Sequence, residues 1–227
     1  MVESISARVL AEMQPALLAN LSGGKQQRKS AEMRILILEV TIDCLVADGY
    51  AGLSIQNIVK TANISRGAMH HHFATKMDLV AAVIEYTFYR RMQQFLVDFT
   101  DNDGTPSEVV RLAADKHWLN VQTREYAAYL ELAIAARTNK ELNGHFQPAA
   151  ERFDRVWSDE MVNSFPQWRE RWAQLQVAND FAVAIHMGLL LNKPILQHDG
   201  SRLDNVRILV LDVIERLHTD VATKPAS

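Results

Sequence analysis

The chain of 227 residues has little of what several common protein classes require. Its single cysteine, Cys44, excludes an intrachain disulfide framework and any cysteine-based zinc cluster. Nine glycines and six prolines, without alternating β-branched runs between hairpin turns, argue against an extensive sheet. No apolar run approaches the roughly 20 residues that span a bilayer. We therefore predict an all-α protein with no membrane partner.

The sequence also lacks the motifs of common catalytic sites. It has no glycine-rich phosphate loop, no G-x-S-x-G elbow and no H-E-x-x-H zinc motif. Histidines 70 to 72 are consecutive, so on a helix their side chains point about 100° apart and cannot converge on one ion. We predict no enzyme activity, no cofactor and no metal site. The opening MVESISARVL has neither a basic leader nor a long apolar stretch, so we expect a cytoplasmic protein.

Charge is present but unevenly distributed. The net charge is −3, yet residues 25–91 hold nine Lys or Arg against six Asp or Glu, which is a local charge of +3. The rest of the chain therefore carries −6. A basic module on an acidic body is typical of a protein that holds DNA by one region.

Residues 53–76, LSIQNIVKTANISRGAMHHHFATK, predict two short helices joined by a tight turn and followed by a third helix. Ser54 can cap the first helix, and Asn63 tolerates the left-handed conformation that a sharp turn needs. Lys76 opens the third helix beside free amides that favour a phosphate. The start of the second helix is the part that meets base edges, and it holds Ser65, Arg66, Gly67, Ala68, His70 and His71.

At these residues the chain resembles the tetracycline-repressor (TetR) family, whose pattern is close to T-x-x-x-I-A-x-x-A-G-V-S-x-G-x-x-Y-x-H-F-x-x-K. Here the segment is S-I-Q-N-I-V-K-T-A-N-I-S-R-G-A-M-H-H-H-F-A-T-K, and the resemblance covers roughly residues 31–80. Asn63 replaces the usual turn glycine, and His70 replaces a tyrosine that touches the DNA backbone in the family. The resemblance implies a core role for Phe73. It implies DNA contacts for Ser54, Arg66, Ala68, His70, His71 and Lys76.

We expect five segments along the chain. They are an N-terminal extension (1–29), a helix-turn-helix DNA-binding domain (30–76), a connecting helix (77–99), a ligand-binding and dimerisation domain (100–220) and a tail (221–227). The first helix of the DNA-binding domain is expected from Ser30 to about Asp48, with Gly49 as its stop. Residues 23–29 are expected to form a flexible basic arm.

Large aromatic side chains are frequent in three helices expected between residues 105 and 165. Most of them should belong to the core. In the family that the chain resembles, however, this region encloses an apolar pocket, and aromatic rings with a polar tip can orient a ligand there. The residues predicted to bind a small, mostly apolar effector are Trp118, Tyr126, Tyr129, Trp157 and Phe165.

The last two expected helices can pair with a second copy of the chain. One runs from about Trp168 to Leu191 and is apolar on nearly all sides over residues 181–191, and the last one carries a single apolar stripe. Together they can form half of a four-helix dimer interface, as the resemblance also implies. The predicted interface residues are Ala178, Ala182, Ile185, Gly188, Val206, Val210, Val213 and Ile214.

The sequence thus leads to one function and one alternative. The first is a ligand-responsive repressor that binds a palindromic double-stranded operator as a homodimer and is released by a small-molecule effector. The alternative is a helical protein-interaction protein or a helical enzyme of unrecognised chemistry. The Ser-Arg-Gly-Ala start at residue 65, correctly spaced from Lys76, favours the repressor because an interaction module has no need for it.

Overall fold

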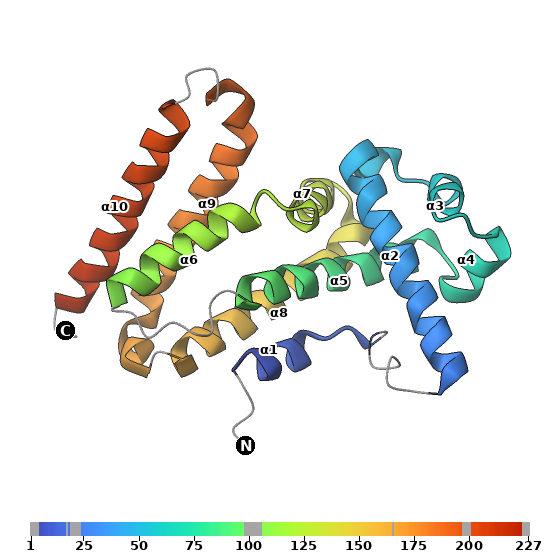
Figure 1. Ribbon diagram of the computed structural model, residues 1–227, viewed down its shortest axis with the longest axis horizontal. Coiled ribbons are helices and arrows are strands. Elements are labelled where there is room, and N and C mark those ends of the chain that lie inside the picture. The colour runs from blue at the N-terminus through green and yellow to red at the C-terminus, as the bar shows by residue number, and fades with distance from the viewer. Residues whose placement is uncertain are drawn as a thin grey trace. The chain divides into compact units, whose positions relative to one another are not determined.

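The computed structural model describes residues 5–16, 18, 24–97, 106–164, 166–196 and 201–223, and these residues form helices without any strand (Figure 1). This confirms the all-α prediction. The elements are α1 (Ile5–Met13), α2 (Lys25–Gly52), α3 (Ile55–Thr61), α4 (Arg66–His72), α5 (Lys76–Val97), α6 (Pro106–Asn120), α7 (Arg124–Ala136), α8 (Lys140–Ser164), the 3₁₀ helix η2 (Pro166–Arg171), α9 (Trp172–Leu196) and α10 (Arg202–Thr223).

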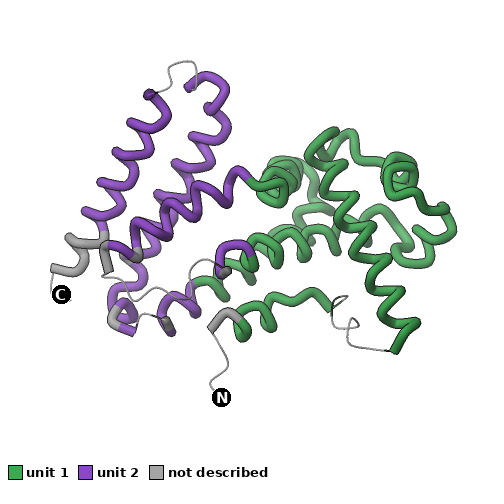
Figure 2. Tube along the Cα trace, in the orientation of Figure 1, with its two compact units in different colours: residues 1–93, 123–157 green, residues 94–122, 158–227 purple. Residues whose placement is uncertain are grey.

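The chain forms two compact units (Figure 2). Unit 1 comprises residues 1–93 and 123–157, and unit 2 comprises residues 94–122 and 158–227. The predicted boundary near residue 100 lies outside the described residues. The observed division differs from the predicted domains because α7 packs along α2, which places residues 123–157 with the helix-turn-helix segment.

The core of unit 1 follows the apolar periodicity of its helices. Ile37, Leu38, Ile42 and Leu45 recur at helical spacing on α2 and are fully buried, as are side chains of α3, α4 and α5. Burying each such side chain contributes about 1.5–3 kcal/mol. The helices that carry the helix-turn-helix segment are therefore fixed to one hydrophobic core.

Helix α2 begins earlier than predicted. The expected start at Ser30 and the expected flexible arm at residues 23–29 were wrong for residues 25–29, which form its exposed first turns. Gly24 is the N-cap, and its N–H donates to Oε1 of Gln27 at 3.1 Å. Gly49 interrupts the helical dihedral angles at φ 67°, so the predicted stop is present as a kink close to the end of α2.

Unit 2 is built from α6, α9 and α10. Val110 and Ala114 of α6 form one buried cluster with Ala182 of α9 and with Val210 and Ile214 of α10. Helix α9 continues through Pro194 to Leu196, beyond the predicted end near Leu191. Proline in a last turn removes one backbone hydrogen bond without ending the helix at once. No helix in the described residues is long and apolar enough to cross a membrane.

Candidate nucleic-acid interface and ligand region

The turn between α3 and α4 has the conformation that its sequence predicts. Ser54 is the N-cap of α3, and its Oγ accepts a hydrogen bond from the N–H of Asn57 at 3.2 Å. Asn63 adopts φ 53°, the left-handed region in which Asn is tolerated better than most residues. This confirms Asn63 as the turn residue in place of the family's usual glycine. Ser54, predicted to contact DNA, is exposed at this end of α3.

Helix α4 is anchored on one side and open on the other. Ser65 caps it by accepting from the N–H of Ala68 at 3.0 Å, while Met69 is fully buried and Phe73 closes the helix in the core. Phe73 therefore lies in the core as predicted. The remaining side chains at the start of α4 face solvent or are half-buried, and these are Arg66, Gly67, Ala68, His70 and His71.

The three consecutive histidines lie in different surroundings. His70 is exposed, and its Nδ1 lies 3.3 Å from the carbonyl oxygen of Ala74. His71 is exposed and meets the half-buried His72 edge to face, with 5.1 Å between ring centroids. Burial lowers the pKa of His72, and the nearby charges of His71 and Arg34 lower it further. The described residues contain no group of three metal-ligating side chains.

Lys76 is exposed at the start of α5, but its ammonium group already has contacts within the chain. It donates to the carbonyl oxygen of Leu53 at 2.6 Å and lies 5.3 Å from the ring centroid of Tyr50. Thr75 and Asp78 form a capping box at the start of α5, with reciprocal hydrogen bonds of 2.9 and 3.0 Å. Lys76 therefore links α5 to the end of α2, and its contact with a phosphate stays a prediction.

The geometry of α3 and α4 agrees with comparisons to known proteins. Residues 37–83 match the model of the bacterial regulatory proteins of the tetR family. Residues 37–83 are therefore similar to the DNA-binding segment of the tetR family, in agreement with the resemblance found in the sequence. An uncharacterised HTH-type transcriptional regulator of Mycobacterium tuberculosis is 31% identical over 124 residues, which are 54% of this chain and 62% of that protein. The HTH-type transcriptional regulator CymR of Pseudomonas putida is 27% identical over 130 residues, or 56% of this chain and 62% of CymR.

The similarity in fold extends beyond the matched segment. A transcriptional regulator from a Rhodococcus species superposes with a TM-score of 0.61 at 16% identity, over 85% of this chain and 99% of that one. GusR of Salmonella enterica gives 0.60 at 17% identity, over 89% and 98% of the two chains. The chain matches less than two thirds of the length of the curated relatives named above. These relatives are named as regulators, in agreement with the prediction that the chain is not an enzyme.

The predicted ligand residues do not all lie together. Tyr126 and Tyr129 meet in unit 1 with ring centroids 5.3 Å apart, and Trp157 is half-buried in the same unit. Trp118 belongs to unit 2, where its ring lies 5.7 Å from that of His186. Phe165 lies outside the described residues.

Sequence reasoning did not single out Arg91, which lies between the two tyrosines. Its guanidinium carbon is 3.9 Å from the ring centroid of Tyr129 and 4.4 Å from that of Tyr126. Phe153 and Phe88 follow at 5.2 and 5.6 Å. Burial lowers the pKa of Arg91, an effect that the two tyrosines partly offset, and burial also raises the pKa of Tyr126 to about 12. We call these four rings the aromatic cage. In the sequence, the only sign of it is that aromatic residues occur every few positions in the helices that supply the rings.

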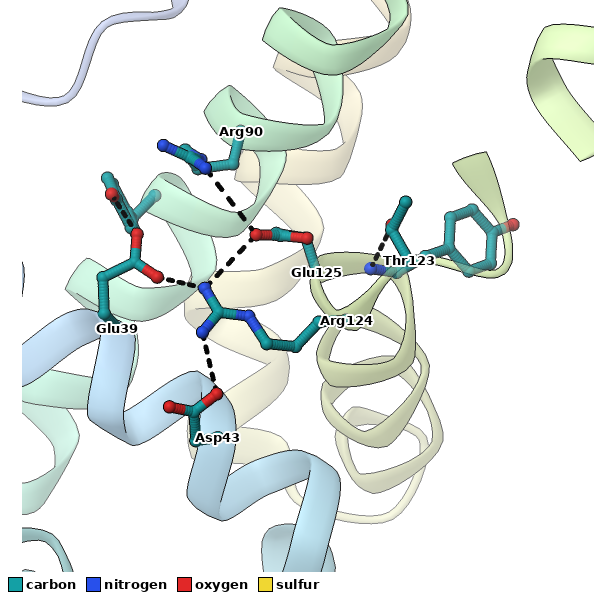
Figure 3. A network of polar contacts seen from close by, with 8 residues as sticks. Glu39, Asp43, Arg90, Thr123, Arg124 and Glu125 are labelled. Carbon is teal, nitrogen blue, oxygen red and sulfur yellow. Dashed lines mark hydrogen bonds and ion pairs between the residues drawn. The ribbon is translucent and has the colours of Figure 1, made fainter. Parts of the chain in front are cut away.

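A polar network next to the aromatic cage ties α7 to α2 (Figure 3). Arg124, the first residue of α7, is hydrogen-bonded to Glu39 and reaches Asp43 at 2.8 Å. Glu125 accepts from Arg124 at 3.3 Å and lies 3.8 Å from Arg90 of α5. Burial alone would lower the pKa of Arg124, but the hydrogen bonds to Glu39 and Asp43 outweigh it and raise the pKa. We call this set of contacts the Arg124 network.

The residues predicted for the dimer interface are largely buried within the chain. Ala182, Val210 and Ile214 belong to the cluster shared by α6, α9 and α10, and Ile185 and Val206 pack against it. Ala178 is also buried, whereas Gly188 and Val213 are half-buried. A different stripe on α9 faces solvent at seven-residue steps, and it consists of Val177, Ala184 and Leu191. We call it the α9 stripe.

Proposed function

We propose that the protein is a cytoplasmic transcriptional repressor that binds a two-fold symmetric DNA operator as a homodimer and releases it when a small effector binds. The observation that carries the proposal is the exposed start of α4. Arg66, His70 and His71 face solvent there, while Met69 and Phe73 fix the same helix to the core. A recognition helix needs this combination, because base edges are read from a helix of fixed position.

The cap at Ser65 adds to this arrangement. Its side chain already accepts from the N–H of Ala68, so it orients the start of α4. Gly67 leaves room for DNA, since a Cβ placed there would meet only the Oγ of Ser65, at 3.8 Å. We assign Arg66 to base contacts, because arginine reads guanine through two parallel hydrogen bonds.

The proposed homodimer would present two copies of α4 to the two halves of an operator. Helix-turn-helix dimers read two half-sites about 34–36 Å apart, so a change in the spacing of the two α4 helices changes affinity. An effector that favours a mismatched spacing releases the DNA, and a coupling of about 1–3 kcal/mol corresponds to a 5- to 150-fold weaker operator complex. We propose the aromatic residues of unit 1 as the effector region.

Binding to the DNA upstream of the protein's own gene tests the proposal, by fluorescence anisotropy over a series of salt concentrations. Arg66→Ala should cost roughly 1–3 kcal/mol and relax the preference at one position of each half-site. Lys76→Ala should weaken binding to all sequences equally and lower the salt slope by about one unit.

Lys140→Ala is the matched control, since Lys140 is an exposed lysine on α8, which lies outside the helix-turn-helix segment. It should leave the affinity and the salt slope nearly unchanged. An affinity that is equal for operator and unrelated DNA, and unaffected by Arg66→Ala, would refute the assignment and favour the protein-interaction alternative.

A further inference from the structure

Arg91 is a buried cation whose charge no carboxylate in the described residues neutralises. It is only 7% exposed, none of the ion pairs among the described residues involves it, and its Nε has no hydrogen-bond partner. An arginine cannot lose its proton under ordinary conditions, so it remains charged in this apolar position. A buried charge without an ionic partner destabilises the fold, and a ligand of opposite charge would remove that cost.

The aromatic cage offsets part of this cost but leaves hydrogen-bonding capacity unused. Cation–π contacts contribute less than the removal of a guanidinium from water costs. A ring face also cannot accept the two parallel N–H donors of guanidinium in the way that a carboxylate does. Tyr129 offers Arg91 one hydrogen bond, and Nε has no partner, so an acceptor with two oxygens and negative charge would complement the guanidinium.

A cavity of about 250 Å³ lies beside the cage. Phe88 is the one ring of the cage that lines the cavity, and Arg91, whose guanidinium is 5.6 Å from this ring, lies on the other side of it. Most of the other residues that line this cavity are apolar or small. The polar ones are the cationic Arg152, the imidazole of His145 and the carboxylate of Glu85. Pockets for drug-sized ligands measure about 300–1,000 Å³, so the space suits a smaller molecule with about one ring.

We propose that the effector of this protein is a small aromatic carboxylate, whose carboxylate pairs with Arg91 and whose ring occupies the cavity beyond Phe88. The proposal rests on the proposed function and names the chemical class of its effector. Tyr126, which lies on the guanidinium, directly follows Arg124 and Glu125. A ligand at Arg91 therefore acts on the first turn of α7, which the Arg124 network fastens to α2.

The experiment measures binding of benzoate, 3-phenylpropionate and 1-naphthoate to the full chain, each against its neutral amide, by calorimetric titration and by the shift in Tm. At least one acid should bind more than tenfold more tightly than its amide. Arg91→Met should abolish that preference and should not lower the Tm, because an apolar side chain of similar length removes a buried charge. Arg91→Lys, which keeps the charge but not the paired donors, should retain only part of the preference.

Arg155→Met on α8 is the matched control, since it removes an exposed arginine and should leave the preference intact. Equal binding of acids and amides, or a preference that survives Arg91→Met, would overturn the proposal. An equal Tm shift with inorganic phosphate would also overturn it, since the site would then select charge and not an aromatic acid. Operator binding without ligand is measured in the same samples: its absence in the wild type defeats the proposed function, whereas its presence without acid binding defeats only the effector class.

Discussion

Asn63 shows how one residue can set the geometry of the proposed DNA-reading segment. Its backbone lies at φ 53°, where a side chain with a Cβ costs about 1–2 kcal/mol and where Asn pays less than most residues. The direction of α4 relative to α3 is set at this residue. On either side of it, the N–H of Ala62 donates to the carbonyl oxygen of Ile58 and the N–H of Ile64 donates to that of Val59.

We predict that Asn63→Ala lowers the free energy of unfolding by about 1 kcal/mol, because alanine lacks the polar group that eases the left-handed conformation. Asn63→Gly should change the free energy of unfolding by no more than a few tenths of a kcal/mol. Glycine adopts the left-handed conformation freely, but this gain is offset by the greater entropy of glycine in the unfolded chain. Urea denaturation followed by circular dichroism measures both variants. Equal losses for alanine and glycine would show that the side chain of Asn63, and not its backbone, matters.

His186 is the residue through which pH should act on unit 2. It is 2% exposed, its Nδ1 lies 2.8 Å from Nδ1 of His117, and Arg207 lies over the neighbouring Trp118. Burial lowers the pKa of His186 to about 4, Arg207 lowers it as well, and Asp115 acts in the opposite direction. The folded chain therefore keeps His186 neutral near neutral pH.

We predict that stability falls as the pH decreases from about 6.5 to about 4. Between these pH values the unfolded chain binds a proton at His186 and the folded chain does not. The stabilisation that neutral His186 gives to the folded state is therefore complete above about pH 6.5 and is lost as the pH falls to about 4. The total from this group is roughly 3 kcal/mol. His186→Gln should flatten the slope measured by denaturation at several pH values, whereas His145→Gln, at an exposed site, should keep it.

At the scale of elements, α7 is the feature that could not be placed from the sequence. The helix itself was predictable from its aromatic and apolar spacing, as was the helix-turn-helix from its two serine caps and Asn63. Its position along α2 depends on pairings such as Arg124 with Asp43, which are 81 residues apart, and local periodicity contains no information on such distant partners. The same reason explains why Arg91 was missed, since its partners come from three helices.

We predict that Arg124→Gln lowers the free energy of unfolding by about 1–2 kcal/mol. Exposed ion pairs are worth about 0–1 kcal/mol each, but Arg124 joins three carboxylates and is only 36% exposed, so several contacts fail together. Arg111→Gln removes a single, more exposed pair with Glu215 and should cost less than 0.5 kcal/mol. The difference between the two variants in thermal denaturation should shrink in high salt.

At the scale of the whole molecule, we expect the second copy of the proposed homodimer to bind at the exposed apolar side chains of unit 2. The α9 stripe repeats every seven residues, the spacing of helices that pair along a seam, and the side chains concerned are exposed within the chain. The originally predicted Val210 and Ile214 are needed inside the chain, so substitutions there report on folding and not on dimerisation.

We predict that Val177→Glu combined with Leu191→Glu yields a folded monomer, because charges at exposed positions disturb an interface without entering the core. Val210→Glu should instead unfold unit 2, since it buries a charge in the cluster with Ala114 and Ala182. Sedimentation at micromolar concentration, with circular dichroism as the test of folding, separates the two results. A wild-type monomer, or a dimer that survives the double change, would contradict the assignment.

The interleaving of the two units also affects how the protein is synthesised. The chain passes from unit 1 to unit 2 and back before unit 1 is complete, so α2 acquires its partner α7 only after all of α6 has been made. At about 5–20 residues per second, the ribosome adds Arg124 roughly 4–16 s after its partner Asp43. During that interval the side of α2 that later contacts α7, including Glu39 and Asp43, is uncovered, and a chaperone that recognises exposed helices has those seconds in which to bind.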